Sequence, residues 1–183
     1  PYLGKSSKPV EEMERAKLEA LAEMLPALVE EGHRALVFSQ FTELLELIAE
    51  QLQAQALPFL SLTGKTAPKE RGNVVQRFQA QEVPVLLLSL KAGGVGLNLS
   101  AADTVIHFDP WWNPAVEAQA TDRAHRIGQT RVVTAYKLIT RDTVEEKIPK
   151  LQEKKRAAID AAIDSEEPIM NGLTTEELEE LLT

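Results

Sequence analysis

The sequence predicts a doubly wound, mostly parallel α/β sheet with flanking helices. Five short apolar runs, each expected to be a strand, alternate with segments that have the apolar period of helices, and the fully apolar run 35–38 is typical of a strand buried on both faces. The runs lie at 35–38, 58–62, 83–90, 104–108 and 132–139. Of the 183 residues, 44% are hydrophobic and 26% are charged, a composition that fits a folded domain rather than a disordered or membrane-spanning chain.

The segments around the first three runs carry helix signals. Leucines at 18, 21, 25 and 28 form one apolar stripe, with Pro26 expected to kink that helix and Gly32 to end it. Thr42 is expected to cap the next helix, and a polar helix is expected over 67–80.

Two further helices are expected later in the chain. Asn113 as N-cap and Pro114 in the first turn predict a helix that runs to about residue 127. Thr143 and Glu146 form a capping box for a helix toward residue 164, which Pro149 should bend or interrupt.

One domain is expected over residues 8–165. Its sheet would occupy 33–140, with flanking helices at 8–31 and 143–164. Residues 166–183 are expected to form a linker and a short C-terminal helix.

Composition excludes several classes of protein. The chain has no cysteine, so disulfide scaffolds, zinc ribbons and thiol nucleophiles are ruled out. His33, His107 and His125 lack the spacing of a zinc site, and no metal ligands are expected. The longest apolar stretch is too short to span a bilayer and no signal peptide is visible, so we expect an intracellular protein.

The net charge of −8 is uneven along the chain. Residues 1–32 carry −3, residues 33–140 carry +1 and residues 141–183 carry −6. Attraction of a phosphate depends on charge within a Debye length of about 8 Å, so the balanced centre is compatible with a local basic groove.

Two phosphate-binding motifs are only partly matched. Gly64-Lys65-Thr66 resembles the end of a P-loop, but Phe59 occupies the position of the first glycine and no magnesium-binding acids follow. Residues 94–99 begin a dinucleotide-binding fingerprint, but Leu99 replaces its last glycine. An ordinary strand-to-helix turn is therefore the favoured interpretation of Gly64.

Three stretches remain as candidates for chemistry. Glycines within 93–96 follow the most buried strand, where the backbone can approach a phosphate or ribose or simply reverse direction. Arg123 and Arg126 are three residues apart, so on a helix they could grip a polyphosphate or form a solvated basic face. Of Trp111 and Trp112, one is expected to pack on the sheet and the other to contact a sugar or base, unless both fill the core.

Taken in order, four stretches resemble the consecutive C-terminal helicase motifs of the Swi/Snf-like ATPases of helicase superfamily two. They are 34–45, 61–78, 86–114 and 119–133, and the last contains the highly specific run DRAHRIGQ. The resemblance covers roughly 8–165 and implies a RecA-like fold, the second lobe of a two-lobed motor. In that family ATP with magnesium binds between the lobes, and the magnesium-binding acids belong to the N-terminal RecA-like lobe, which this sequence does not match.

The resemblance also implies roles for individual residues. Arg123 and Arg126 would be catalytic arginine fingers facing the triphosphate. The nucleotide would be lined by Gly94, Gly96, Asn98 and Gln119, with Asn98 near the ribose. The backbone of double-stranded DNA would be lined by Ser39, Gln40, Gly64, Lys65, Ser89, Lys91 and Trp112.

Two positions depart from the family's pattern. Leu90 stands where many relatives have a hydroxyl residue, so Ser89 would take over that phosphate contact or the contact would be lost. Pro149 interrupts the helix that relatives use to brace the two lobes.

We therefore expect half of an ATP-dependent double-stranded DNA translocase, inactive without its first lobe and DNA-associated in the nucleoid or the nucleus. One alternative is a strand-separating or RNA helicase lobe, although no insertion is large enough for a strand-splitting hairpin. Another is a catalytically inactive nucleic-acid-binding module, against which the intact pair of arginines counts.

Overall fold

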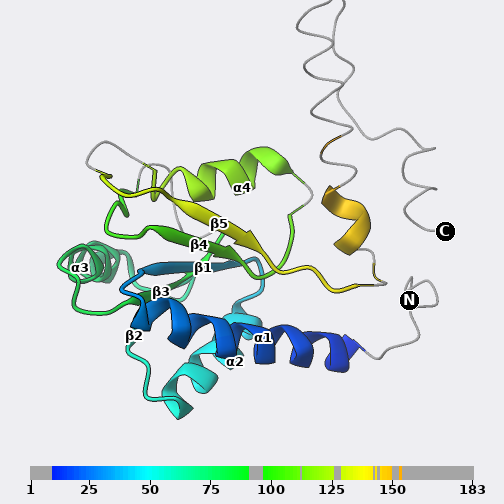
Figure 1. Cartoon of the computed structure of the whole chain (residues 1–183). Coiled ribbons are helices and arrows are strands. Elements are labelled where there is room, and N and C mark those ends of the chain that lie inside the picture. Colours follow the sequence, from blue (N-terminus) through cyan, green and yellow to red (C-terminus); the bar gives the residue numbers. More distant parts are fainter. Residues whose placement is uncertain are drawn as a thin grey trace, which may run out of the picture.

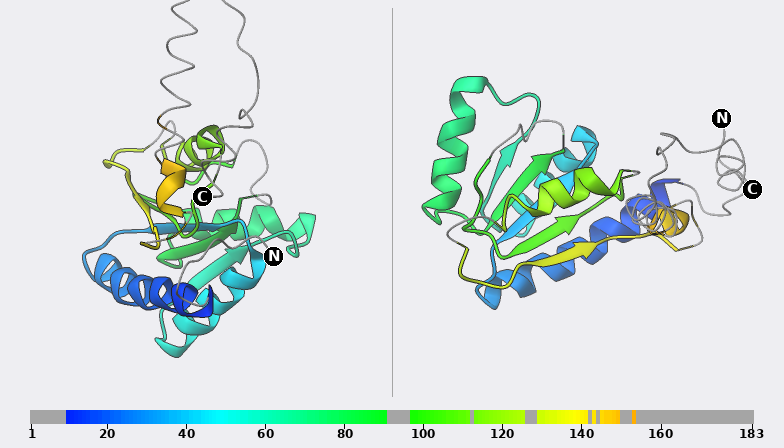
Figure 2. Two further views of the ribbon diagram at one scale, coloured as in Figure 1. Left: turned by 90° about the vertical axis from the view of Figure 1, so that its right-hand side faces the viewer. Right: turned by 90° about the horizontal axis from the view of Figure 1, so that it is seen from above.

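A computed structural model shows a sheet between two layers of helices (Figure 1). It describes residues 10–90, 97–111, 113–125, 129–141, 143, 145–149 and 153. The helices α1 (Val10–Glu30) and α2 (Thr42–Ala54) cover one face of the sheet, and α3 (Pro68–Gln79) and α4 (Pro114–Thr121) cover the other. The two further views in Figure 2 show the same layering from the side and from above.

All four strand pairings are parallel, as the sequence predicts, and the strand order is β2-β3-β1-β4-β5. The strands are β1 (Ala35–Ser39), β2 (Phe59–Leu62), β3 (Val85–Ser89), β4 (Thr104–His107) and β5 (Thr134–Lys137). The chain crosses from one side of β1 to the other between β3 and β4. In such sheets, ligands bind beyond the carboxyl ends of the strands where the winding reverses, which here is between β1 and β4.

The central strands are buried on both faces, which explains why their sequences are continuous apolar runs. Phe38 and Leu86 point into the layer under α3 and α4, whereas Val37 and Leu87 point into the layer under α1 and α2. The edge strand β5 differs, because all four of its residues are exposed. This exposure follows from the position of β5 at the edge of the sheet, where it has a neighbour on one side only.

Most helix ends follow the sequence signals. Gly32 has φ +84° and closes α1, with the N–H of His33 donating to the carbonyl of Leu28 at 2.9 Å. Asn113 caps α4 by accepting from the N–H of Ala115 at 3.1 Å. Thr42, however, is the first residue of α2 and not its cap.

The helix α4 ends at Thr121, earlier than the predicted end near residue 127. Turns follow over 122–124. The N–H groups of Arg123 and Ala124 donate to carbonyls three residues back, those of Ala120 and Thr121, so the pattern of the α-helix gives way to tighter turns. In these turns the carbonyl of Arg123 accepts a hydrogen bond of 2.9 Å from the N–H of Leu99.

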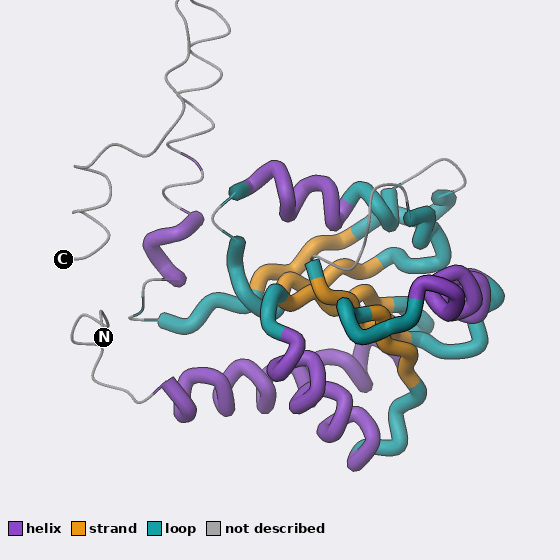
Figure 3. The backbone as a smooth tube through the Cα atoms, turned by 180° about the vertical axis from the view of Figure 1, so that it is seen from behind, coloured by secondary structure: helices purple, strands orange, loops and turns teal. Residues whose placement is uncertain are grey.

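A short helix lies over 145–149, at the left of the tube view in Figure 3. The hydroxyl of Thr143 accepts from the N–H of Glu145 at 3.2 Å, as expected of a helix cap. Of the predicted extension toward residue 164, residue 153 is described and is helical; the rest of the extension and the C-terminal linker lie outside the described residues.

Candidate functional site

Five predicted DNA-contacting residues come together where β1, β2 and β3 end. Ser39 and Ser89 are the last residues of β1 and β3 and are direct partners in the parallel register. Gln40 follows β1, and Gly64 with Lys65 follows β2, the neighbour of β3 on its other side. We call this line of strand ends, together with the end of β4, the carboxyl edge.

Burial separates these residues into two groups. The side chains of Ser39 and Ser89 are almost fully buried, whereas Gly64 and Lys65 are exposed and Gln40 is half-buried. Lys65 forms an ion pair with Glu46 of α2, and this hydrogen-bonded carboxylate raises the pKa of Lys65. Of these five residues, Gln40, Gly64 and Lys65 are therefore the ones that reach the surface at the carboxyl edge.

A buried carboxylate, Asp109, holds the loop after β1. Its Oδ1 accepts from the hydroxyl of Ser39 at 2.5 Å, and its Oδ2 accepts from the N–H of Gln40 at 2.9 Å. Burial raises the pKa of Asp109, and the hydrogen bonds from Ser39 and Gln40 and the nearby charge of Lys17 oppose that rise only in part. The loops after β1 and β4 are thus tied to each other.

The ammonium group of Lys17 connects α1 to the same end of the sheet. It donates to the carbonyl of Phe108 at 3.2 Å and to the carboxylate of Glu145 at 2.6 Å. Glu145 also accepts from the N–H of Thr140 at 2.9 Å. This cluster joins α1, β4 and the helix at 145–149.

The predicted nucleotide-facing residues lie on the α4 side of the sheet. The bond from the N–H of Leu99 to the carbonyl of Arg123 places Asn98 close to Arg123 in the fold. Asn98 and Gln119 are exposed, whereas Arg123 is 7% exposed, with its guanidinium carbon 5.6 Å from the centre of the Phe38 ring. Gln119 lies within α4, whereas Arg123 lies in the turns that follow the end of the helix at Thr121.

Five of the predicted site residues lie outside the described part of the chain. They are Lys91, Gly94, Gly96, Trp112 and Arg126. Their roles stay predictions.

A second polar cluster joins α4 to β4 and β5. The carboxylate of Glu117 accepts from the N–H of Trp111 at 2.8 Å and forms an ion pair with Lys137. Nearby, the Nε2 of His107 lies 3.1 Å from the hydroxyl of Thr121. Burial lowers the pKa of His107, and the charge of Glu117 opposes this effect while that of Lys137 adds to it.

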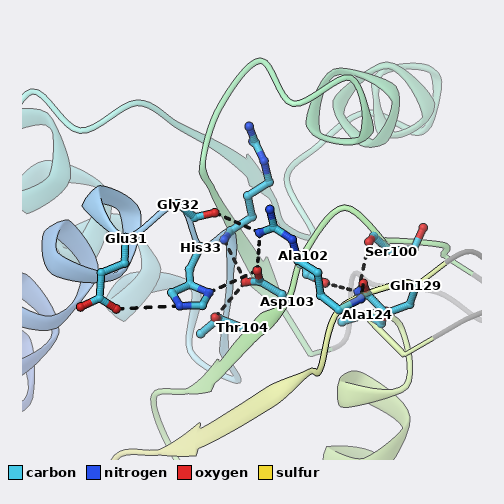
Figure 4. A network of polar contacts seen from close by, with 11 residues as sticks. Glu31, Gly32, His33, Ser100, Ala102, Asp103, Thr104, Ala124 and Gln129 are labelled. Atoms are coloured by element: carbon cyan, nitrogen blue, oxygen red, sulfur yellow. Dashed lines mark hydrogen bonds and ion pairs between the residues drawn. The ribbon is translucent and has the colours of Figure 1, made fainter.

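At the amino ends of the strands, far from this site, Asp103 is the centre of a third cluster (Figure 4). It accepts from Arg131 at 2.7 Å and from the N–H of Arg34 at 3.0 Å, and the Nδ1 of His33 lies 3.2 Å away. Burial alone would raise the pKa of Asp103, but hydrogen bonds from Arg131, Arg34, His33 and Thr104 hold it below its ordinary value. The cluster joins the segments that lead into β1, β4 and β5.

Several of these residues were missed by the reading of the sequence. Asp103 and Asp109 lie within the helicase-like stretch 86–114 but were assigned no role, Glu117 lies outside these stretches, and Phe38 is one apolar residue within an apolar run. Asp109 could have been found, because it directly follows the β4 run and must share the carboxyl edge with Ser39. The environments of Glu117 and Phe38 depend on contacts across the fold that no spacing reveals.

Comparison with known proteins identifies the domain. A family model described as "Helicase conserved C-terminal domain" matches residues 16–128. The chain belongs to this helicase family. No helix in the part of the chain that the structure describes is long and apolar enough to cross a bilayer.

Relatives of this helicase domain include bacterial and fungal proteins. The "Putative ATP-dependent helicase/translocase YwqA" of Bacillus subtilis is 48% identical over 168 residues, which cover 91% of this chain and 18% of that protein. The "Chromatin-remodeling ATPase INO80" of Aspergillus oryzae is 49% identical over 135 residues, 73% of this chain and 9% of that protein. The chain thus spans less than a fifth of either protein.

A solved structure has the same fold. It is described as the "C-terminal part of Fun30 ATPase domain" and aligns with a TM-score of 0.71 and 35% identity over 88% of this chain and 48% of that one. Together with the relatives, it shows that the chain is the C-terminal, RecA-like helicase domain of a Swi/Snf-like ATPase.

Proposed function

We propose that this helicase domain is the second motor lobe of an ATP-dependent translocase on double-stranded DNA. Arg123 and Arg126 would act as arginine fingers, and the carboxyl edge would form part of the DNA track. The observation that carries the proposal is the bond between Leu99 and Arg123, which joins the segment after the glycine-rich loop to the arginine motif. Two motifs that the family resemblance assigns to ATP are thereby neighbours in the fold.

The described residues fit one half of a site for ATP with magnesium. Arg123 supplies a cation with a planar, bidentate fork suited to phosphate oxygens, and Asn98 supplies an exposed amide. The buried carboxylates nearby, Asp109 and Glu117, already hold hydrogen-bond or ion-pair partners. We therefore propose that the ligands for magnesium, and a P-loop, come from an N-terminal RecA-like lobe.

In the proposed reaction, the contribution of this lobe is electrostatic. Phosphoryl transfer develops charge on the equatorial oxygens of the transferred group, and an arginine finger stabilises that charge. Gly94, Gly96, Asn98 and Gln119 would orient the nucleotide on the same side.

On the DNA side, we propose that contacts are made to phosphates and not to base edges. Gln40, Gly64 and Lys65 would make these contacts directly, joined by Lys91 and Trp112. Because the hydroxyls of Ser39 and Ser89 are buried, we propose that both residues act by shaping the loops of the carboxyl edge. Such contacts fix the position of the duplex without reading its sequence.

The proposal is tested with a motor that combines this chain and the first lobe. We expect ATP hydrolysis to be stimulated by double-stranded DNA more than by single-stranded DNA or RNA, and we expect the motor to displace a third strand from a triplex. The chain alone should not hydrolyse ATP. Turnover by the chain alone that is lost in Lys65→Ala would contradict the two-lobe assignment, and stimulation mainly by RNA or single strands would favour the other helicase class.

A further inference from the structure

Gln129, the last residue of the run DRAHRIGQ, ties the arginine motif to a distant segment of the chain (Figure 4). Its Nε2 donates to the carbonyls of Ser100, Ala102 and Ala124 at 3.1, 2.6 and 3.1 Å. Ser100 and Ala102 lie in the segment 98–102, whereas Ala124 lies in the arginine motif. One side-chain amide thus joins two stretches that lie far apart in the sequence.

The orientation of this amide follows from its neighbours. The N–H of Arg131 donates to the Oε1 of Gln129 at 2.9 Å, and a backbone N–H can only donate. The three carbonyls can only accept, so the nitrogen of the amide must face them. The guanidinium of Arg131 is itself anchored on Asp103 at 2.7 Å, so the backbone that follows Gln129 is held as well.

The carbonyls that Gln129 binds belong to the interior of the domain. Ala102 and Ala124 are fully buried, and a buried carbonyl that loses its donor is costly. Between these two contacts, the N–H of Leu99 donates to the carbonyl of Arg123 at 2.9 Å. Arg123 is therefore held on the segment that contains Asn98 both by the backbone and by the amide of Gln129.

We propose that Gln129 is a positioning residue for the arginine motif. It fixes Arg123 relative to Asn98, and it fixes both ends of the stretch 124–129, which contains Arg126. The inference rests on the proposed function of the two arginines. Gln129 acts through the backbone of these stretches, so its contribution is to hold the guanidinium groups in place before charge develops on the phosphate. Such preorganisation affects the transition state more than the ground state, so kcat should change more than KM.

Gln79 of α3 provides a matched control, because it holds the same segment by the opposite end of its amide. Its Oε1 accepts from the N–H of Ala101 at 2.8 Å, and its Nε2 donates to the hydroxyl of Ser100 at 3.3 Å. Both glutamines are half-buried, but the side-chain hydrogen bonds that Gln79 makes in the described part of the chain reach the segment 98–102 only. Gln79→Glu keeps the acceptor for Ala101, whereas Gln129→Glu places an acceptor-only carboxylate against three carbonyl oxygens. The same substitution, with the same added charge, should therefore break one link and keep the other.

The first test measures hydrogen exchange in the isotopically labelled chain. In the wild type, the side-chain amide protons of Gln129, assigned by their absence in Gln129→Met, should exchange with water more slowly than those of a free glutamine. The N–H of Leu99 reports whether the segment 98–102 stays bonded to the carbonyl of Arg123. We expect Gln129→Glu to accelerate its exchange about tenfold or more, and Gln79→Glu to change it less than about twofold.

Gln129→Met removes the donors without adding a charge, so it should also accelerate the exchange of Leu99, and it replaces Gln129→Glu if the carboxylate prevents folding. Fast exchange of the Gln129 amide protons in the wild-type chain would overturn the proposal. Unchanged exchange of Leu99 in the Gln129 variants would overturn it as well.

The second test measures ATP turnover by the two-lobed motor with saturating duplex, well below the melting temperature of each variant. We expect Gln129→Glu and Gln129→Met to lower kcat about tenfold with little change in KM, and Gln79→Glu to leave kcat near the wild-type value. In an Arg123→Ala background, the further loss caused by Gln129→Glu should be smaller, because one of the groups that it positions is already gone. Equal kcat in Gln129→Glu and Gln79→Glu would refute a positioning role. If Arg123→Ala itself left kcat intact, the proposed function would fail, whereas the exchange of Leu99 would still decide whether Gln129 joins the two stretches.

Discussion

The hydroxyl of Ser39 donates a hydrogen bond of 2.5 Å to the carboxylate of Asp109, 70 residues further along the chain. The same carboxylate accepts from the N–H of Gln40, so it fixes the backbone of the loop after β1 from the end of β4. Ser39, predicted from the resemblance to line DNA, is therefore a buried residue that helps to fix the loop after β1. Its prediction as a DNA contact stays a prediction.

Loss of the Asp109 carboxylate should destabilise the fold. Asp109→Ala leaves the buried hydroxyl of Ser39 and the N–H of Gln40 without their acceptor, which costs about 1–3 kcal/mol in the free energy of unfolding. Asp109→Asn keeps one oxygen acceptor and carries no charge, so it should cost less. Asp122→Ala, at an exposed carboxylate, should change stability by less than about 0.5 kcal/mol. Urea denaturation of the three variants measures these differences, and equal stability of Asp109→Ala and the wild type would show that the loop needs no such anchor.

The buried His107 should make the chain less stable in mild acid. Burial lowers its pKa below the ordinary 6.5, so as the pH falls through 6.5 the unfolded chain takes up a proton before the folded chain does. The free energy of unfolding should therefore be highest above pH 6.5 and should fall as the pH drops toward the folded pKa.

His107→Gln isolates this effect, because glutamine can still donate to Thr121 but does not titrate. We expect the variant to lose less stability than the wild type between about pH 7.5 and pH 5, measured by urea denaturation at each pH. The same loss in both proteins would mean that His107 is as easily protonated in the fold as in the unfolded chain.

The fold was largely predictable, because its strands are local apolar runs. The runs at 35–38 and 83–90 each became a fully buried parallel strand, and Gly32 ended its helix through local geometry alone. The exposure of β5 was not predictable in this way. It depends on which strand ends the sheet, and an edge position is a property of the topology.

The candidate site was predicted less completely than the fold, because the positions of its residues depend on contacts between distant segments. The spacing of Arg123 and Arg126 suggests one helix face, but a bond between Leu99 and Arg123 accompanies the earlier end of α4. Glu117 looks like a solvated helix residue in the sequence, yet it is buried against Lys137 of β5. Both facts depend on contacts between distant segments, which periodicity cannot reveal.

DNA binding by the chain should be weak, indifferent to sequence and strongly dependent on salt. Only a few phosphates can be neutralised, and each contributes about 0.9 to the slope of log affinity against log salt, so we expect a slope of roughly −2 to −4. Lys65→Ala should weaken binding equally for all sequences and reduce the steepness of the slope by about 1.

Arg77→Ala is the matched control for Lys65, because Arg77 is also an exposed cation paired with a carboxylate but lies near the end of α3, away from the carboxyl edge. It should leave affinity and slope unchanged. Fluorescence anisotropy of a labelled duplex over a salt series measures both quantities. A slope near zero, or a strong preference for one sequence, would argue against a phosphate track.

The arginine motif provides the most direct prediction about catalysis. In the two-lobed motor, Arg123→Ala and Arg126→Ala should each lower kcat by a factor on the order of 10² or more. A single arginine finger contributes a factor of about 10³ to 10⁵, and the expected loss is smaller here because two arginines would share the stabilisation. ATP binding should change much less, because the charge that the fingers stabilise develops only in the transition state. Arg123→Lys should rescue little, since a point charge cannot reproduce the planar fork of a guanidinium.

DNA affinity should barely change in these arginine variants, because Arg123 is buried against Phe38 on the α4 side of the sheet and Lys65 is exposed at the carboxyl edge. The measurement is ATP turnover with saturating duplex, alongside DNA binding without nucleotide, with Arg77→Ala as the control. If Arg126→Ala kept full turnover but lost DNA binding, the arginines would be a clamp on the DNA backbone. The two faces of the lobe would then have the reverse of the roles proposed for them.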